Sequence, residues 1–212
     1  MSLNRRQFLA AGAGLLGTAA SGAALTRAIW PMMSREDLIP GEAPDVALRP
    51  EAWAESADRL RFAAIGDNGS GGRQAMAVAG RMAETYRTKP FGLVSLLGDI
   101  CYYGSFDDRY DDVFAKPMGP LIDAGVGFEL AIVNHDGNLG HSDASLREID
   151  AELRLLGTPG RFYTSRHGPA DFFYLDSSFP GVFGPTSSEQ WDWLDTALAE
   201  ASGQWKIVAL HH

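Results

Sequence analysis

The sequence predicts an α/β fold, a sandwich of two mixed β-sheets flanked by helices. Four short apolar runs have the length of buried strands, and each ends in side chains that offer oxygen or nitrogen ligands. Segments with helical spacing lie between these runs. Because open α/β sheets place their sites beyond the carboxyl ends of the strands, we expect the runs to converge on a site for two metal ions.

The four runs share one arrangement, an apolar stretch followed at once by ligand-type residues. They are 61–65 with Asp67 and Asn68, 93–97 with Asp99 and Tyr102, 130–133 with Asn134 and His135, and 205–210 with His211 and His212. Each pair alone is a weak signal, since an aspartate after a strand is often a turn former. The succession of four such strand ends is what indicates a site.

The donor types indicate which metals would bind. Carboxylate, amide and imidazole ligands suit Fe, Mn or Zn, and Cys101 is the single cysteine, so neither a disulfide nor a thiolate metal site is expected. One bridging carboxylate would hold two ions roughly 3.5–4 Å apart. Cys101 and Tyr103 are interpreted as packing or loop residues.

Composition limits the classes of protein and partner. A chain of 212 residues with 45% hydrophobic and 21% charged residues is typical of one soluble globular domain. The formal net charge of -9 argues against a nucleic-acid partner, which needs basic patches. It does not exclude an anionic substrate, because bound cations invert the local field.

Residues 1–28 are interpreted as a twin-arginine signal peptide. Arg5 and Arg6 precede a Gly/Ala-rich stretch of low hydrophobicity, which suits this export route better than a stable membrane span. We therefore expect the twin-arginine export machinery as a partner, a periplasmic or secreted location, and no stable membrane span in the mature form. An uncut N-terminal anchor is the alternative.

The rest of the chain divides into a linker and a domain. Residues 29–58 are rich in proline and are predicted to be a linker or an extended arm, and residues 59–212 form the domain. Within the domain, residues 73–87 are predicted to be a helix after a Gly-rich turn at 66–72. That turn is expected to let backbone approach a ligand at the helix N-terminus, with a plain strand-to-helix connection as the alternative.

Later segments give mixed signals. The acidic residues 105–112 lack EF-hand spacing and are predicted to be a solvated loop, and Pro117 and Pro120 predict a short or broken helix after them. A helix is expected at 146–156, two strands around the turn at 167–169, and a helix at 188–201 with Ser188 as its N-cap.

The chain resembles the calcineurin-like metallophosphoesterases and, within them, the purple acid phosphatases of the tartrate-resistant type. The resemblance covers about residue 60 to the end. It rests on 66–69 (Gly-Asp-Asn-Gly), 98–102 (Gly-Asp-Ile-Cys-Tyr), 134–136 (Asn-His-Asp) and 208–211 (Val-Ala-Leu-His), and extends to 161–163, 175–177 and 190–194. It implies a four-layer αββα sandwich.

The resemblance also implies the ligand set and two metal ions. The implied metal ligands are Asp67, Asp99, Tyr102, Asn134 and His211. Asp67 and Tyr102 would bind Fe(III), Asp99 would bridge the two ions, and the second ion would be Fe, Zn or Mn.

Catalytic and substrate roles follow from the same resemblance. His135 would be the general acid in hydrolysis of a phosphate monoester, a small phosphorylated substrate, by a metal-bound hydroxide. Asn68, His141 and His212 are expected near the substrate. A solvated loop position is the alternative for His141, and a loop residue is the alternative for His212.

Two departures from the family pattern bear on function. Val133 stands where the family has glycine, and the final Gly-His-x-His motif is absent. We therefore expect a fragment of an enzyme that lacks the C-terminal strands, with an inactive 212-residue form as one alternative. The alternatives are a phosphodiesterase or nucleotide-directed hydrolase of the same superfamily, a non-catalytic truncated remnant, and a purely structural export-linked domain.

Overall fold

The computed structural model describes residues 41–48, 58–102, 104–132, 143–177 and 188–212. The predicted signal peptide therefore lies outside the described residues. The elements follow one another as β1 (Phe62–Ile65), α3 (Arg73–Thr88), β2 (Leu93–Leu96), α4 (Phe106–Tyr110), η3 (Asp111–Ala115), α5 (Lys116–Asp123), β3 (Gly127–Leu130), α6 (Asp143–Leu156), β4 (Tyr163–His167), β5 (Ala170–Tyr174), α7 (Ser188–Glu200) and β6 (Trp205–Ala209). This is an α/β fold, as the sequence predicted.

The first sheet contains β1, β2 and β3 in that order, all parallel. Its central strand, β2, is buried at all four residues, which explains its continuous apolar run. We had expected two mixed sheets, but the described strands of this one are wholly parallel. Helical crossovers between consecutive strands return the chain in the same direction, which gives parallel pairing.

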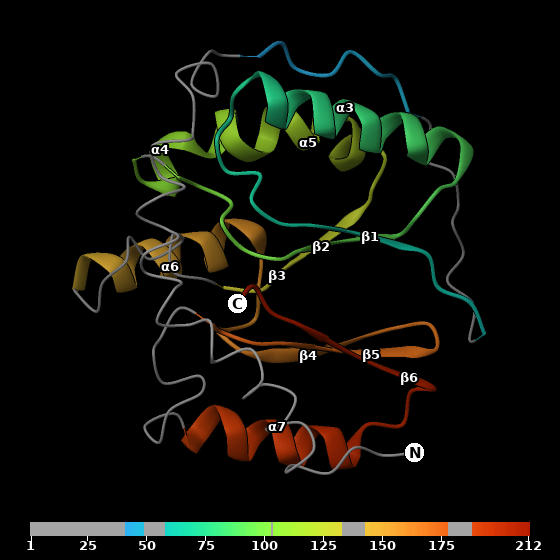
Figure 1. The fold of residues 1–212 in the computed structure, drawn as a ribbon, viewed down its shortest axis with the longest axis vertical. Coiled ribbons are helices and arrows are strands. Elements are labelled where there is room, and N and C mark those ends of the chain that lie inside the picture. The colour runs from blue at the N-terminus through green and yellow to red at the C-terminus, as the bar shows by residue number, and fades with distance from the viewer. Residues whose placement is uncertain (1–40, 49–57, 103, 133–142, 178–187) are drawn as a thin grey trace.

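The second sheet is mixed and contains β4, β5 and β6. β4 and β5 form an antiparallel hairpin around the predicted turn, and β6 returns through α7 to pair parallel with β5. The fourth apolar run of the sequence therefore belongs to a different sheet from the first three. Its carboxyl end still points toward the same part of the molecule (Figure 1).

Three hydrophobic clusters hold these layers together. The largest packs α3, α5 and α6 against the first sheet, the second lies between the two sheets, and the third joins α7 to the outer face of the second sheet. Figure 1 shows α3 and α5 beyond the first sheet and α7 beyond the second. Both sheets are therefore covered on two faces in the described part of the chain.

Helix α3 confirms the helix predicted at 73–87. Its buried residues, Met76, Ala79, Ala83 and Tyr86, lie on the face that the spacing indicated. Residues 41–48 form neither helix nor strand and run along this helix (Figure 1). A Cβ on Gly41 would lie 2.6 Å from Cγ of Met76, so this glycine is needed for the close approach.

The acidic segment 105–112 is not the solvated loop that we predicted. Ser105 caps α4 by accepting a hydrogen bond from the amide of Asp108 at 3.2 Å. Asp107 and Asp108 lie in the first turn of α4, where negative charge is favourable. The acidic residues were correctly expected at the surface, but capping makes them helical; α5 is short, as its prolines predicted.

A polar network joins the two sheets beside β3. The carboxylate of Glu129 accepts hydrogen bonds from Ser165 at 2.6 Å and pairs with Nε2 of His167 at 2.9 Å. The Tyr163 hydroxyl accepts from the amide of Leu130 at 3.0 Å and donates to its carbonyl at 3.2 Å. These contacts fix the hairpin β4–β5 against the open edge of β3.

Candidate metal centre

Three of the predicted ligands meet at the carboxyl ends of the strands. Asp67 follows β1, Asp99 follows β2, and His211 follows β6, and one ligand atom from each lies within 4.8 Å of the other two. Asp99 is buried, His211 is half-buried and Asp67 is exposed. Two strands of the first sheet and one strand of the second thus supply one cluster.

Both aspartates have left-handed backbone conformations. The φ angle is 57° at Asp67 and 55° at Asp99, and no other non-glycine residue of the described ranges has a positive φ. The left-handed conformation is energetically unfavourable for branched or bulky residues. Glycine adopts it most readily, and Asn and Asp tolerate it better than the other residues. Non-glycine residues held in this way cluster at functional sites. No signal in the sequence had indicated it.

The two aspartate loops are hydrogen-bonded to each other through their backbones. The amide of Asp67 donates to the Gly98 carbonyl at 3.1 Å, and the amide of Gly69 donates to the Asp99 carbonyl at 2.9 Å. The amide of Tyr102 donates back to the Gly69 carbonyl at 3.0 Å. The loops therefore form one unit that fixes the separation of the two carboxylates.

Gly69 is required by this loop contact. A Cβ there would lie 2.4 Å from the amide nitrogen of Cys101 and from the carbonyl carbon of Ile100. We had expected the Gly-rich turn to approach a ligand, but at Gly69 the close approach is to the neighbouring loop. Cys101 is buried, in agreement with its interpretation as a packing residue.

Tyr102 belongs to the same cluster. Its hydroxyl donates a hydrogen bond to Oδ1 of Asp67 at 3.0 Å. A phenol and a carboxylate that share a hydrogen bond could both bind one ion after loss of the phenolic proton. The structure thus brings together the two residues that the resemblance assigns to the first metal.

The hydrogen bonding of His211 leaves one ring nitrogen for a ligand. Its Nδ1 lies 2.7 Å from the carbonyl oxygen of Leu97. Because a carbonyl only accepts, Nδ1 carries the proton, and in the neutral ring Nε2 presents a lone pair. Nε2 lies 3.8 Å from Oδ2 of Asp99. Two tetrahedral ligands of one cation at roughly 2.0–2.2 Å would be roughly 3.3–3.6 Å apart, a little closer than these two atoms lie.

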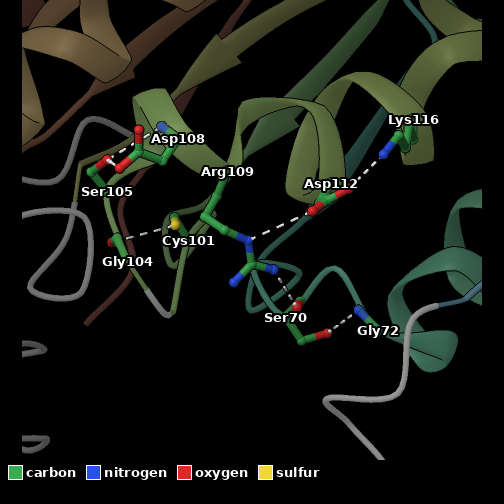
Figure 2. A network of polar contacts seen from close by, with 9 residues as sticks. All are labelled: Ser70, Gly72, Cys101, Gly104, Ser105, Asp108, Arg109, Asp112 and Lys116. Atoms are coloured by element: carbon green, nitrogen blue, oxygen red, sulfur yellow. Dashed lines mark hydrogen bonds and ion pairs between the residues drawn. The ribbon is translucent and has the colours of Figure 1, made fainter.

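A second polar network supports the Gly-rich turn from outside (Figure 2). The Ser70 hydroxyl accepts from the amide of Gly72 at 3.2 Å, and Arg109 donates to the Ser70 carbonyl at 3.4 Å. Nε of Arg109 lies 4.0 Å from Asp112. The hydrogen bond from Lys116, followed by the charge of that lysine, lowers the pKa of Asp112. Arg109 was missed by the sequence analysis, because nothing in its neighbourhood indicates a contact 39 residues away.

The structure describes only some of the other predicted site residues. Asn134, His135, His141, Val133 and Tyr103 lie outside the described residues. Asn68 is buried, and neither polar atom of its side chain has a hydrogen-bond partner within the described ranges. A buried amide in that state is costly, so its polar atoms call for a further hydrogen-bond partner.

His212 lies beside the cluster. Its ring centroid is 5.0 Å from that of His211, and its Nδ1 contacts Ser177, at 3.1 Å from the carbonyl oxygen and 3.3 Å from the hydroxyl. Ser177 had no assigned role in the sequence analysis. Arg161, Asp176 and Gln190 were noted only as part of the resemblance. The structure brings them together just beyond the carboxyl end of β5.

Comparison with solved structures places the fold. A purple acid phosphatase from yellow lupin (Lupinus luteus) seeds matches with a TM-score of 0.52 and 18% identity, over 70% of this chain and 29% of that chain. The chain therefore shares its fold with part of a phosphatase. A dimetal phosphatase from Danio rerio matches with a TM-score of 0.39 and 21% identity, over 65% of this chain and 51% of that chain.

The match is partial in length. The chain spans less than a third of the lupin enzyme and about half of the Danio rerio protein. No protein-family model matches the sequence, and no curated protein matches it. Among the described helices, none combines the length and the apolar character needed to cross a membrane.

Proposed function

We propose that this domain belongs to a metal-dependent phosphoesterase that hydrolyses phosphate monoesters and binds two metal ions. The observation that carries the proposal is the convergence of Asp67, Asp99 and His211, with ligand atoms within 4.8 Å of one another. The carboxylate pair, the imidazole and the adjacent phenol of Tyr102 are ligands that fit Fe, Zn or Mn. The fold shared with part of a purple acid phosphatase supports the same reading.

Each residue of this cluster would have its own role in binding the two ions. Asp67 and Tyr102 would hold one ion, and Asp99 would contact both ions from its buried position. His211 would bind the second ion through Nε2, because Leu97 holds the proton on Nδ1. When bound, the ions supply positive charge for the phosphate and lower the pKa of a water molecule.

Substrate binding and proton transfer would involve residues near this cluster. The amide of Asn68 has unmet hydrogen-bonding capacity, which suits a phosphate oxygen or its water. We propose His135 as general acid together with Asn134 as a ligand of the second ion, both on the basis of the sequence motif. His141 remains a substrate-binding prediction.

Cellular context and overall architecture are also part of the proposal. The three clusters of the described domain fit a four-layer αββα sandwich. The Arg-Arg pattern at residues 5–6 supports export by the twin-arginine route to the periplasm or beyond. Fusion of residues 1–28 to a reporter tests the route: export should cease when both arginines are changed to lysine.

Activity is tested with an aryl phosphate monoester after loading with Fe plus Zn or Mn. We expect hydrolysis that depends on metal and is lost in Asp99→Asn. Asp123→Asn is the matched control, because Asp123 is an exposed acid at the end of α5. Metal binding without any hydrolysis would refute the enzymatic proposal, and preference for a bis-aryl phosphate would favour a phosphodiesterase instead.

A further inference from the structure

Arg109, on α4, contacts both of the loops that carry the proposed ligands of the first ion. These are the Asp67 loop, between β1 and α3, and the Tyr102 loop, between β2 and α4. The guanidinium reaches the first loop, where Nη2 donates to the Ser70 carbonyl at 3.4 Å. The aliphatic stem lies against the second, since a Cβ on Gly104 would be 3.5 Å from Cγ of Arg109. Figure 2 shows the side chain with Ser70 on one side and Gly104 on the other.

The Asp67 loop is shaped to fit closely against α4 and η3. Gly71 has a left-handed φ of 65°. A Cβ there would lie 3.0 Å from the carbonyl oxygen of Asp112 and 3.1 Å from Nη2 of Arg109. Glycine suits both the angle and the space. The loop therefore meets the guanidinium directly, with no side chain between them.

The guanidinium of Arg109 is itself held in place. Its Nε lies 4.0 Å from Oδ2 of Asp112, and Oδ1 of that carboxylate pairs with Nζ of Lys116 at 2.6 Å. Asp112 lies in η3, a π-helical turn of a kind that is frequent at functional sites. The side chain of Arg109 is 28% exposed, against 64% for Arg154 in its surface ion pair. Water therefore screens the contacts of Arg109 less than those of an ordinary surface arginine.

The same two loops are joined at the metal centre. The amide of Tyr102 donates to the Gly69 carbonyl at 3.0 Å, and the amide of Gly69 donates to the Asp99 carbonyl at 2.9 Å. The Tyr102 hydroxyl donates to Oδ1 of Asp67 at 3.0 Å. These bonds cross from one loop to the other, as the contacts of Arg109 do. A change in the separation of the loops would therefore move the phenol relative to the carboxylate.

We propose that Arg109 is a positioning residue that holds the Asp67 and Tyr102 loops at the separation needed by the first metal ion. The inference rests on the proposed function for its meaning at the metal. Arg109 acts through the backbone of the two loops. Its loss should loosen the ligands of the first ion more than His211, which follows β6 and is bound to the Leu97 carbonyl. Residues that support metal ligands commonly alter metal affinity or activity by about 10–100-fold.

The first test needs neither metal nor activity. Amide hydrogen exchange in the metal-free chain reports how often each bond between the loops opens. Arg109→Met keeps an aliphatic stem but has no donor for the Ser70 carbonyl. We expect the amides of Gly69 and Tyr102, which bond loop to loop, to exchange about 10-fold faster in this variant.

Three comparisons separate this effect from a general loss of stability. Arg154→Met removes an exposed arginine that pairs with Asp107 on the same helix at 3.2 Å, and it should leave both loop amides unchanged. Arg109→Lys keeps the charge but not the planar fork, so the exchange should be only about 3-fold faster. The amide of Ala131 donates to the Leu96 carbonyl within the first sheet at 2.8 Å, and its exchange should change less than that of the loop amides.

Two outcomes would overturn the proposal. One is an equal change of exchange at Ala131 and at the two loop amides, which would indicate a general loss of stability. The other is the same effect on the loop amides from Arg154→Met as from Arg109→Met. If Arg109→Met does not fold, Arg109→Lys decides by the same criteria.

The second test measures zinc binding by titration calorimetry. Arg109→Met should bind zinc about 10-fold more weakly than Arg154→Met, and Arg109→Lys should recover part of the affinity. Equal affinities in the two methionine variants would overturn the role of Arg109 at the metal. If the parent chain binds no zinc, the proposed function fails. The exchange rates of the metal-free chain still decide the positioning role in that case, so the two failures are distinguishable.

Discussion

At the scale of single residues, the site depends on two aspartates with left-handed backbone conformations. The φ angles of 57° and 55° place the carboxylates of Asp67 and Asp99 toward His211. Strain and the proximity of two acids both oppose folding in the absence of a cation. We therefore expect function and stability to conflict at these positions.

Asp99→Asn tests this conflict. Asparagine tolerates the left-handed region well and removes one negative charge, so the free energy of unfolding should rise by about 0.5–1 kcal/mol. Zinc affinity should fall by more than about 100-fold, beyond the usual effect of second-sphere changes. Chemical denaturation and titration calorimetry measure the two effects. Asp123→Asn should change neither, and lower stability in Asp99→Asn would contradict the argument.

Tyr102→Phe addresses the proposed first metal. The variant loses the 3.0 Å hydrogen bond to Asp67, which should cost about 0.5–1.5 kcal/mol of unfolding free energy. If the phenol binds Fe(III), the ferric parent should show a visible charge-transfer band that the variant lacks. Absorption spectra of iron-loaded parent and variant check this. Tyr110→Phe is the control, since Tyr110 packs among aromatic rings of the core.

The residues of the site were predictable to different degrees. The proximity of Asp67, Asp99 and His211 could be predicted because each stands within two residues of the end of an apolar run, and parallel strands bring their carboxyl ends together. The support from Arg109 and Ser177 was not predicted, since it consists of single contacts between distant segments with no periodic signal. The burial of Asn68 depends on how two loops pack, which no local pattern reports.

At the scale of elements, the positions of most strands and helices could be predicted from periodicity and turn residues. The helical structure of the acidic segment 105–112 could not. Its hydrophobic spacing is interrupted, and the capping by Ser105 that makes it helical depends on one hydrogen bond. Strand pairing beyond the hairpin also escaped prediction. β5 pairs in parallel with β6 from Ala170 with Trp205 to Tyr174 with Ala209, a register between segments far apart in the sequence that no local pattern reports.

The contact between β3 and β4 should make stability depend on pH. Burial, the largest single influence, raises the pKa of Glu129, but hydrogen bonds from His167 and Ser165 and the charge of His167 together outweigh it and lower the pKa from 4.5. A lowered pKa stabilises the fold above the unfolded value, and this contribution is lost as the pH falls through the folded value.

Glu129→Gln should remove this dependence. Near neutral pH we expect the variant to lose about 1–3 kcal/mol of unfolding free energy, because charge-assisted hydrogen bonds disappear. The difference between parent and variant should begin to shrink as the pH falls below 4.5, the ordinary value, and disappear once the pH passes the lower pKa of the folded state, where the folded parent also loses its charge. Urea denaturation over a pH series checks this against Glu84→Gln, an exposed pair with Arg81. A constant difference at all pH values would refute it.

At the scale of the whole molecule, the metal centre joins both sheets, since Asp67 and Asp99 follow strands of the first and His211 follows a strand of the second. A cation that binds all three residues binds the folded state alone. Its removal should therefore weaken the whole domain and not only a loop.

Chelation measures this coupling. With zinc at 100 times its dissociation constant, the folded state gains about 2.7 kcal/mol. For a chain of this size that corresponds to a rise in Tm of about 5–10 °C, which EDTA should abolish. Differential scanning calorimetry of parent and Asp99→Asn checks it. The variant should show almost no zinc-dependent shift, and an equal shift in both would place the ion elsewhere.

The hydroxyl of Tyr163 has a wider consequence for the first sheet. Burial raises the pKa of Tyr163, so the group keeps its proton and satisfies both the amide and the carbonyl of Leu130. Those two groups face away from β2, where another molecule's strand would otherwise attach. A phenylalanine here would leave them vacant. One hydroxyl thus satisfies two backbone groups on the outer side of β3 that would otherwise be open to a strand of another molecule.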